Sequence, residues 1–184
     1  MPSERNDMNR GFTLVEALVA MAVLAVSLTP IFAQVTASFR LSRNIQESLT
    51  ASMLAQEGIE LVRGMRDDNW FRDDPFYTNI IECDAGCRVQ VQTPPALCDY
   101  GPVGSPFCLM DDNGEVLLRD TAGAYQYQSG TPTPYKRTVR VTDLDPGDPD
   151  HRQLEILSTV TWESPGQPMR RVEVTGYLFD WLDF

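Results

Sequence analysis

The sequence predicts an α+β fold in which one long N-terminal helix packs on an antiparallel β-sheet. An apolar run from Phe12 to Ala33 contains 22 residues and a single charge, Glu16. No proline interrupts residues 34–66, where alanine, leucine, glutamine, glutamate and arginine favour helix. Beyond residue 69, short segments alternate apolar and polar residues, as strands with one buried face do. A long helix followed by several strands is typical of an α+β domain.

The composition fits one globular domain and argues against several function classes. The chain has 184 residues, of which 42% are hydrophobic, and this suffices for one modest core. Its formal net charge of -11 opposes contact with phosphate backbones, so we expect no nucleic acid partner despite a small basic cluster at Lys136, Arg137 and Arg140. The only histidine, His151, lies in no catalytic motif. We therefore expect a protein that is not an enzyme and needs no cofactor.

The apolar run predicts a helix that crosses a membrane once. Its 22 residues span roughly 33 Å as a helix, and a bilayer core is about 30 Å thick. Arg5 and Arg10 precede the run, and the positive-inside rule then keeps the N-terminus in the cytoplasm and sends the rest outward. A carboxylate inside such a helix costs about 2–3 kcal/mol, so Glu16 needs a partner or a task. A cleaved secretory signal would be shorter, and a plain signal anchor would not explain Glu16.

We expect the helix to continue beyond the membrane with one amphipathic face. Leu41, Ile45, Leu49 and Met53 recur every four residues, and this spacing predicts that they cover the sheet. Three further apolar residues continue the face, namely Ile59, Val62 and Met65. Pro30 either bends the helix or marks the end of the membrane span.

Alternating segments after the helix predict the strands of the sheet. The expected strands are residues 88–93, 115–119, 135–141, 154–162 and 169–179, with 125–127 as a weaker sixth. The 154–162 segment is the clearest case, because its even-numbered residues from Ile156 to Trp162 share one face. Asp112-Asn113-Gly114 and Ser164-Pro165-Gly166-Gln167 have the composition of hairpin turns.

The residues from Arg10 to Glu16, RGFTLVE, resemble the processing site of type IV prepilins and pseudopilins. In that family a membrane peptidase cuts after the glycine and methylates the new N-terminal amine. The resemblance implies that Gly11 ends a leader peptide and that Phe12 becomes the methylated first residue. Glu16 is then the fifth residue of the mature chain, where the family has a glutamate that pairs with the terminal amine of a neighbouring subunit. A pair with Phe12 of the same helix is the alternative, because the two residues are one turn apart.

The resemblance also implies how the chain is divided and what it does. Residues 1–11 would be the leader, 12–33 the transmembrane and filament-core helix, 34–68 its amphipathic continuation, and 69–184 the exported β-rich head of a pilin lollipop. The implied function is that of a structural minor pilin-like subunit of a type IV pilus-type filament. The alternatives are a minor pseudopilin of a type II secretion apparatus and a pilus-tip adhesin.

The implied partners and location follow from the same family. The expected partners are the prepilin peptidase, other pilin subunits and the pilus assembly machinery. Before assembly the chain would be a single-pass inner-membrane protein, and after assembly it would be part of an extracellular filament. Residues 55–63 and 66–70 look like the helix end of pilus-modification-type minor pilins, and residues 135–141, 160–162 and 177–181 look like their strands.

Four cysteines in the exported part predict disulfides. Cys83, Cys87, Cys98 and Cys108 lie in one stretch of 26 residues, and an even count outside the cytoplasm favours oxidised pairs. Three connectivities are open, of which Cys83–Cys87 with Cys98–Cys108 is the most local. The spacing does not match the paired arms of a zinc ribbon.

An acidic loop between two predicted strands is a weak candidate for a calcium site. Asp143, Asp145, Asp148 and Asp150 present oxygen ligands at nearly alternating positions. Two prolines stiffen this loop, and no glutamate follows at the offset of an EF-hand. A solvated hairpin loop explains the same residues, and we expect no metal there.

Overall fold

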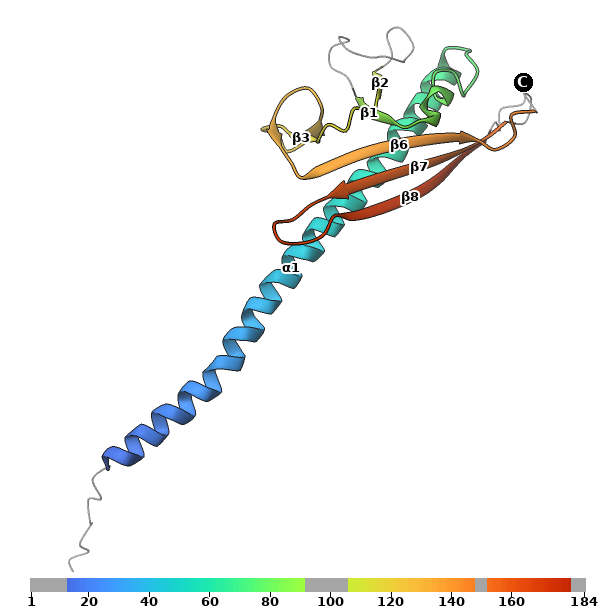
Figure 1. The fold of residues 1–184 in the computed structure, drawn as a ribbon. Coiled ribbons are helices and arrows are strands. Elements are labelled where there is room, and N and C mark those ends of the chain that lie inside the picture. The colour runs from blue at the N-terminus through green and yellow to red at the C-terminus, as the bar shows by residue number, and fades with distance from the viewer. Residues whose placement is uncertain (1–12, 92–105, 148–151, 180–184) are drawn as a thin grey trace, which may run out of the picture. The chain divides into compact units, whose positions relative to one another are not determined.

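A computed structural model describes residues 13–91, 106–147 and 152–179 of the chain (Figure 1). The described elements are α1 (Leu14–Phe71), η1 (Ile81–Asp84), β1 (Cys87–Val91), β2 (Phe107–Asp111), β3 (Leu118–Arg119), β4 (Tyr125–Gln126), β5 (Thr131–Pro132), β6 (Tyr135–Asp143), β7 (Gln153–Trp162) and β8 (Arg170–Phe179). The chain divides into two compact units, residues 1–46 and 47–184. One long helix with antiparallel sheets confirms the predicted α+β, pilin-like fold.

The first unit contains the N-terminal part of α1. Pro30 lies within α1 and the helix continues beyond it, so this proline does not end the helix. The large apolar side chains of this part are exposed, from Leu14 at 78% to Ile45 at 58%. An exposed apolar helix of this kind needs a covering that the described chain itself does not supply.

The second unit is built on a five-stranded antiparallel sheet with the strand order β2-β1-β6-β7-β8. The strands β6, β7 and β8 pair over their lengths, with Tyr135 opposite Trp162 and Gln153 opposite Phe179. In Figure 1 these strands lie beside the C-terminal part of α1. Core residues come from both layers, among them Val62 and Met65 of the helix. The strands predicted at 135–141, 154–162 and 169–179 are thus present, with slightly different ends.

A second, three-stranded sheet with the order β4-β3-β5 differs from what the sequence predicts. The predicted strand at 115–119 is reduced to β3, and β2 and β5 are strands that the alternation does not reveal. Asp112-Asn113-Gly114 forms a turn, in which the Gly114 N–H donates to the Asp112 side chain at 2.9 Å. It connects the two sheets, so its prediction as a hairpin turn is wrong. Ser164–Gln167 does join β7 to β8 as a hairpin.

The face of the helix that packs on the sheet differs from the predicted one. Leu49 and Met53 are 59% and 62% exposed, so this part of the four-residue stripe points away from the head. The buried face begins at Ala51, Leu54 and Ala55, and it mixes small residues with large apolar ones. Where this face carries small side chains, at Ala51, Ala55 and Gly58, the helix backbone can approach the sheet closely, and the close packing favours this face over the predicted stripe. The later predicted residues Ile59, Val62 and Met65 are buried.

Gly58 marks a close approach of the helix to the sheet. A Cβ atom at this position would lie 2.5 Å from the Ser158 hydroxyl and 3.2 Å from both Arg137 Cδ and Val139 Cγ2. Gly64 has the same role further along the helix, because the Phe107 ring of β2 occupies the space that a Cβ atom at this position would need. Glycines that would weaken an isolated helix here permit its packing.

Arg137 corrects the expectation of a basic surface cluster. Its side chain is fully buried between the helix and the sheet, whereas Lys136 and Arg140 are exposed on the opposite face of β6. The guanidinium donates to the Leu54 carbonyl at 3.2 Å and to the Val89 carbonyl at 2.6 Å, and it pairs with Glu57 at 3.1 Å. Arg137 therefore ties the helix to the sheet.

Candidate processing and assembly site

The predicted processing residues Gly11 and Phe12 lie outside the described residues, which begin at Thr13. Thr13 precedes the first turn of α1 and caps it. Its hydroxyl accepts a hydrogen bond from the Glu16 N–H at 3.3 Å, and its carbonyl accepts one from the Ala17 N–H at 3.1 Å. A threonine followed three residues later by glutamate is the pattern of a capping box, which satisfies free N–H groups at a helix start.

Glu16 lies in the first turn of α1, where a carboxylate interacts favourably with the helix dipole. This gives Glu16 a local role in addition to the one expected from the sequence. The signal for the local role is the Thr13-x-x-Glu16 spacing, which is hidden within the cleavage motif. Glu16 is exposed, so the described residues leave its carboxylate accessible to another chain.

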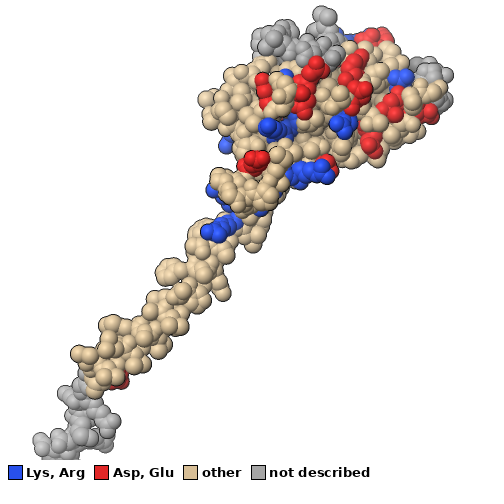
Figure 2. Space-filling model, in the orientation of Figure 1, with Lys and Arg blue, Asp and Glu red and all other residues tan. Residues whose placement is uncertain are grey.

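The surface around Glu16 is apolar along the helix. The most apolar stretch of 18 residues in α1 contains no buried residue. The helix is long and apolar enough to cross a membrane. Figure 2 shows this helix surface as almost entirely uncharged on the face drawn. Polar side chains within it are satisfied internally, since Ser27 donates to the Val23 carbonyl at 2.7 Å and Thr29 to the Ala25 carbonyl at 2.9 Å. Such internal bonds suit a helix surrounded by lipid or by other helices.

The cysteines lie in the head, apart from this helix in sequence. Cys83 and Cys87 form a disulfide with an S–S distance of 2.14 Å, which closes the short segment between η1 and β1. Cys108 on β2 is also disulfide-bonded, and Cys98 lies outside the described residues. Among the described residues there is no free cysteine, and Cys83, Cys87 and Cys108 are all oxidised.

The acidic loop shows a use for Asp143 that does not involve a metal. Its carboxylate pairs with Arg152 at 3.2 Å and accepts the Asp145 N–H at 3.1 Å. Both partners are local, and they close the connection between β6 and β7. Within the described ranges no group of three potential metal ligands occurs, while Asp148 and Asp150 lie outside those ranges.

Comparison with known proteins agrees with the geometry of the N-terminal helix. Residues 6–32 match the family model of the prokaryotic N-terminal methylation motif. This match begins before the helix start at Leu14 and ends within the exposed apolar part of α1. No curated protein and no solved structure matches the chain. The matched motif, together with one long apolar helix on an α+β head, is consistent with membership of the type IV prepilin and pseudopilin family.

Proposed function

We propose that this protein is a minor pilin-like subunit of a type IV pilus-type filament. The prepilin peptidase cuts after Gly11 and methylates Phe12, and the mature subunit then enters the filament through its N-terminal helix. The observation that carries the proposal is the methylation motif at residues 6–32, which includes most of an apolar helix segment that has no covering from the described chain. The protein acts by assembly and has no catalytic role.

Charge pairing gives Glu16 its role in this proposal. Cleavage leaves a positive amine at Phe12, and a carboxylate in a low-dielectric surrounding is its natural partner. Glu16 is the one charge between Phe12 and Ala33, so an incoming subunit has one place to register its amine. The pair compensates the cost of about 2–3 kcal/mol for a carboxylate at membrane depth.

The topology follows from the same arrangement. The N-terminus lies in the cytoplasm, the apolar helix spans the inner membrane before assembly, and the head is exported. Oxidised Cys83 and Cys87 in the head support export, because disulfides persist outside the cytoplasm. After assembly the head is displayed on an extracellular filament. The partners are the prepilin peptidase, other pilin subunits and the assembly machinery.

Two variants of Glu16 test the proposal in cells that assemble filaments. Glu16→Gln keeps the size of the side chain and the capping pattern, since glutamine also serves at this position, but it removes the charge. Glu16→Ala removes both. We expect both proteins to be inserted and cleaved, and to be strongly depleted from sheared filaments relative to the membrane fraction. Glu60→Gln, at an exposed position of the same helix, is the matched control and should enter filaments normally.

Three results are informative in this assay. Depletion of both Glu16 variants with normal cleavage supports charge pairing during assembly. Depletion of Glu16→Ala alone would assign Glu16 to helix capping and contradict the pairing. Wild-type amounts of both variants in filaments would contradict any assembly role for Glu16.

A further inference from the structure

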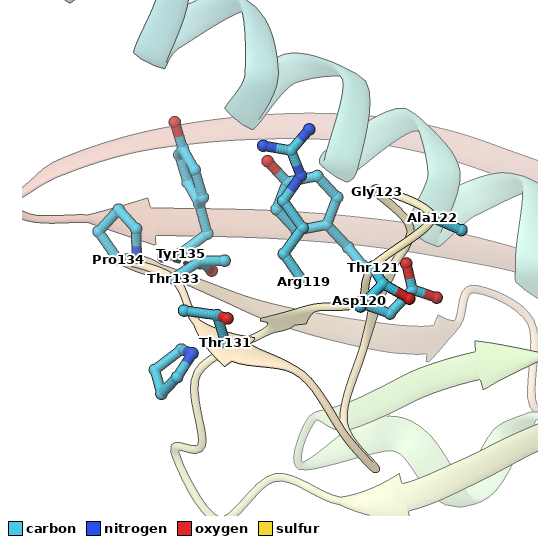
Figure 3. A pocket seen from close by; sticks show the side chains of 11 residues that line it. Arg119, Asp120, Thr121, Ala122, Gly123, Thr131, Thr133, Pro134 and Tyr135 are labelled. Carbon is cyan, nitrogen blue, oxygen red and sulfur yellow. Dashed lines mark hydrogen bonds between the residues drawn. The ribbon is translucent and has the colours of Figure 1, made fainter.

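A cavity of about 570 Å³ opens in the head beside the three-stranded sheet (Figure 3). Two segments form it: residues 119–125, which connect β3 to β4, and residues 131–135, which run from β5 into β6. The cavity is widely open to solvent, and its volume is in the range of small-molecule sites. All of it lies in the second unit, remote in sequence from the helix used for processing and assembly.

Arg119 supplies an unused positive charge at this cavity. Within the described ranges its guanidinium has no carboxylate partner and no hydrogen bond, although the protein carries an excess of acidic residues. Many other described arginines are engaged by carboxylates, namely Arg63, Arg66, Arg72, Arg88, Arg137, Arg152 and Arg171. Figure 3 shows the Arg119 and Tyr135 side chains extending in the same direction from their strands. A guanidinium in this state is a ready partner for an incoming carboxylate.

Aromatic and hydroxyl groups complete the lining. The Tyr125 and Tyr135 rings meet edge to face with centroids 6.2 Å apart, and Tyr135 is fixed by its hydrogen bond to the Glu47 carbonyl at 3.3 Å. The exposed hydroxyls of Thr121 and Thr131 make no hydrogen bond within the described residues. By contrast, the Thr133 hydroxyl is occupied by the Leu117 carbonyl at 2.6 Å.

Asp120 adds an acceptor without cancelling the charge of Arg119. One of its carboxylate oxygens accepts the Ala124 N–H at 2.9 Å, which holds the loop and leaves the second oxygen for a ligand hydroxyl. In Figure 3 the Asp120 and Arg119 side chains point in different directions. The cavity thus offers one cation, several hydroxyl partners and an aromatic wall, but no deep apolar pocket for an aliphatic side chain.

From this combination we propose that the cavity binds a saccharide carrying a carboxylate. The carboxylate pairs with Arg119, the ring packs against the half-buried Tyr125, which the buried Tyr135 supports from behind, and the sugar hydroxyls bond to Thr121, Thr131 and Asp120. The proposal gives the displayed head a recognition function of its own. It does not depend on filament assembly, because the cavity belongs to the single subunit.

Binding to the full chain tests the proposal with two matched probes. Glucuronic acid and glucose share one ring and differ in the carboxylate, and acetate carries a carboxylate without a ring. The protein is kept in a detergent without a sugar headgroup, because such a headgroup would compete. We expect saturable binding of glucuronic acid by ligand-observed NMR, with a dissociation constant at least about tenfold below those of glucose and acetate.

Variants assign the binding to this cavity. Arg119→Gln should weaken glucuronic acid binding at least about tenfold and remove the preference over glucose. Thr131→Val keeps the shape of the side chain and removes its hydroxyl. It should weaken the binding of both sugars by a smaller factor than Arg119→Gln weakens the binding of glucuronic acid. Arg140→Gln is the matched control, because Arg140 is an exposed arginine on the far face of β6, and it should bind as the wild type does.

The possible failures each overturn the proposal. Equal affinity for glucuronic acid and glucose would contradict recognition of the carboxylate by Arg119. Equal affinity for glucuronic acid and acetate would contradict recognition of the sugar ring. The same loss in Arg140→Gln as in Arg119→Gln would show a general charge effect. Absence of saturable binding to the wild-type chain would refute the site itself, while leaving cleavage and assembly unaffected.

Discussion

Replacing Gly58 by alanine should destabilise the head even though alanine is the better helix former. The added methyl would lie 2.5 Å from the Ser158 hydroxyl and 3.2 Å from two further carbon atoms, Arg137 Cδ and Val139 Cγ2. Overpacking of a dense core costs about 1–3 kcal/mol, and the gain in helix propensity is at most about 1 kcal/mol. Because the 2.5 Å contact is with the fully buried Ser158, the cost should lie in the upper part of that range, and the net loss should be about 1–2 kcal/mol in the free energy of unfolding.

Urea unfolding of the full chain in detergent, followed by tryptophan fluorescence, measures this loss. Trp162 is 3% exposed in the core of the head, so its emission reports on that unit. With a urea dependence of about 2 kcal/mol per molar, the midpoint should fall by about 0.5–1 M. Gln56→Ala, at an exposed position of the same helix, is the control and should leave the midpoint nearly unchanged.

A second substitution tests whether steric contact with Ser158 causes the loss of stability in Gly58→Ala. The Ser158 hydroxyl is buried without a hydrogen bond partner within the described residues, so Ser158→Ala alone should be neutral or stabilising. Combined with Gly58→Ala, it should recover part of the lost stability, with a coupling energy of about 0.5–3 kcal/mol. An unchanged or higher midpoint for Gly58→Ala would refute the close approach of helix and sheet.

The contacts in the head also predict how its stability responds to a substitution, to a rise in pH and to calcium. Glu57→Ala should cost about 1–3 kcal/mol because buried Arg137 loses its counter-charge, while Glu60→Ala on the surface should cost less than about 1 kcal/mol in the same urea assay. Burial raises the pKa of the Tyr127 hydroxyl above its value in the unfolded chain. The stability that the neutral hydroxyl contributes is therefore complete below about pH 10 and is lost as the pH rises further. A Tyr127→Phe variant should lose less stability than the wild type in that alkaline range. Millimolar calcium should leave the thermal midpoint unchanged, because Arg152 already holds the Asp143 carboxylate, and a rise of the midpoint would contradict this.

The parts of the fold that the sequence predicts are those with a strong local pattern. The strand around Ile156 and Trp162 alternates strictly, and both residues are buried as expected. β2 has no such pattern, since four of its residues from Phe107 to Met110 are apolar or cysteine, and its pairing with distant β1 decides its structure. Long-range pairing of this kind leaves no local trace.

The candidate site residues likewise divide into those that a local sequence pattern reveals and those that it does not. The cleavage motif and Glu16 are visible in the sequence because the motif is contiguous, whereas the cap by Thr13 is hidden within the same residues. Leu49 and Met53 are exposed, against the prediction, because periodicity shows that a face is apolar but not which partner covers it. Charge alone predicts Arg137 at the surface, although its position on the inward face of β6 follows from strand alternation.

Mass spectrometry of the N-terminus tests the central claim most directly. The chain is recovered from cells with an active prepilin peptidase and, as a control, from cells without it. We expect the first chain to begin at Phe12 with a methylated amine, and the control to retain Met1 and the leader through Gly11. An intact Met1 N-terminus in cells with active peptidase would contradict processing as a prepilin.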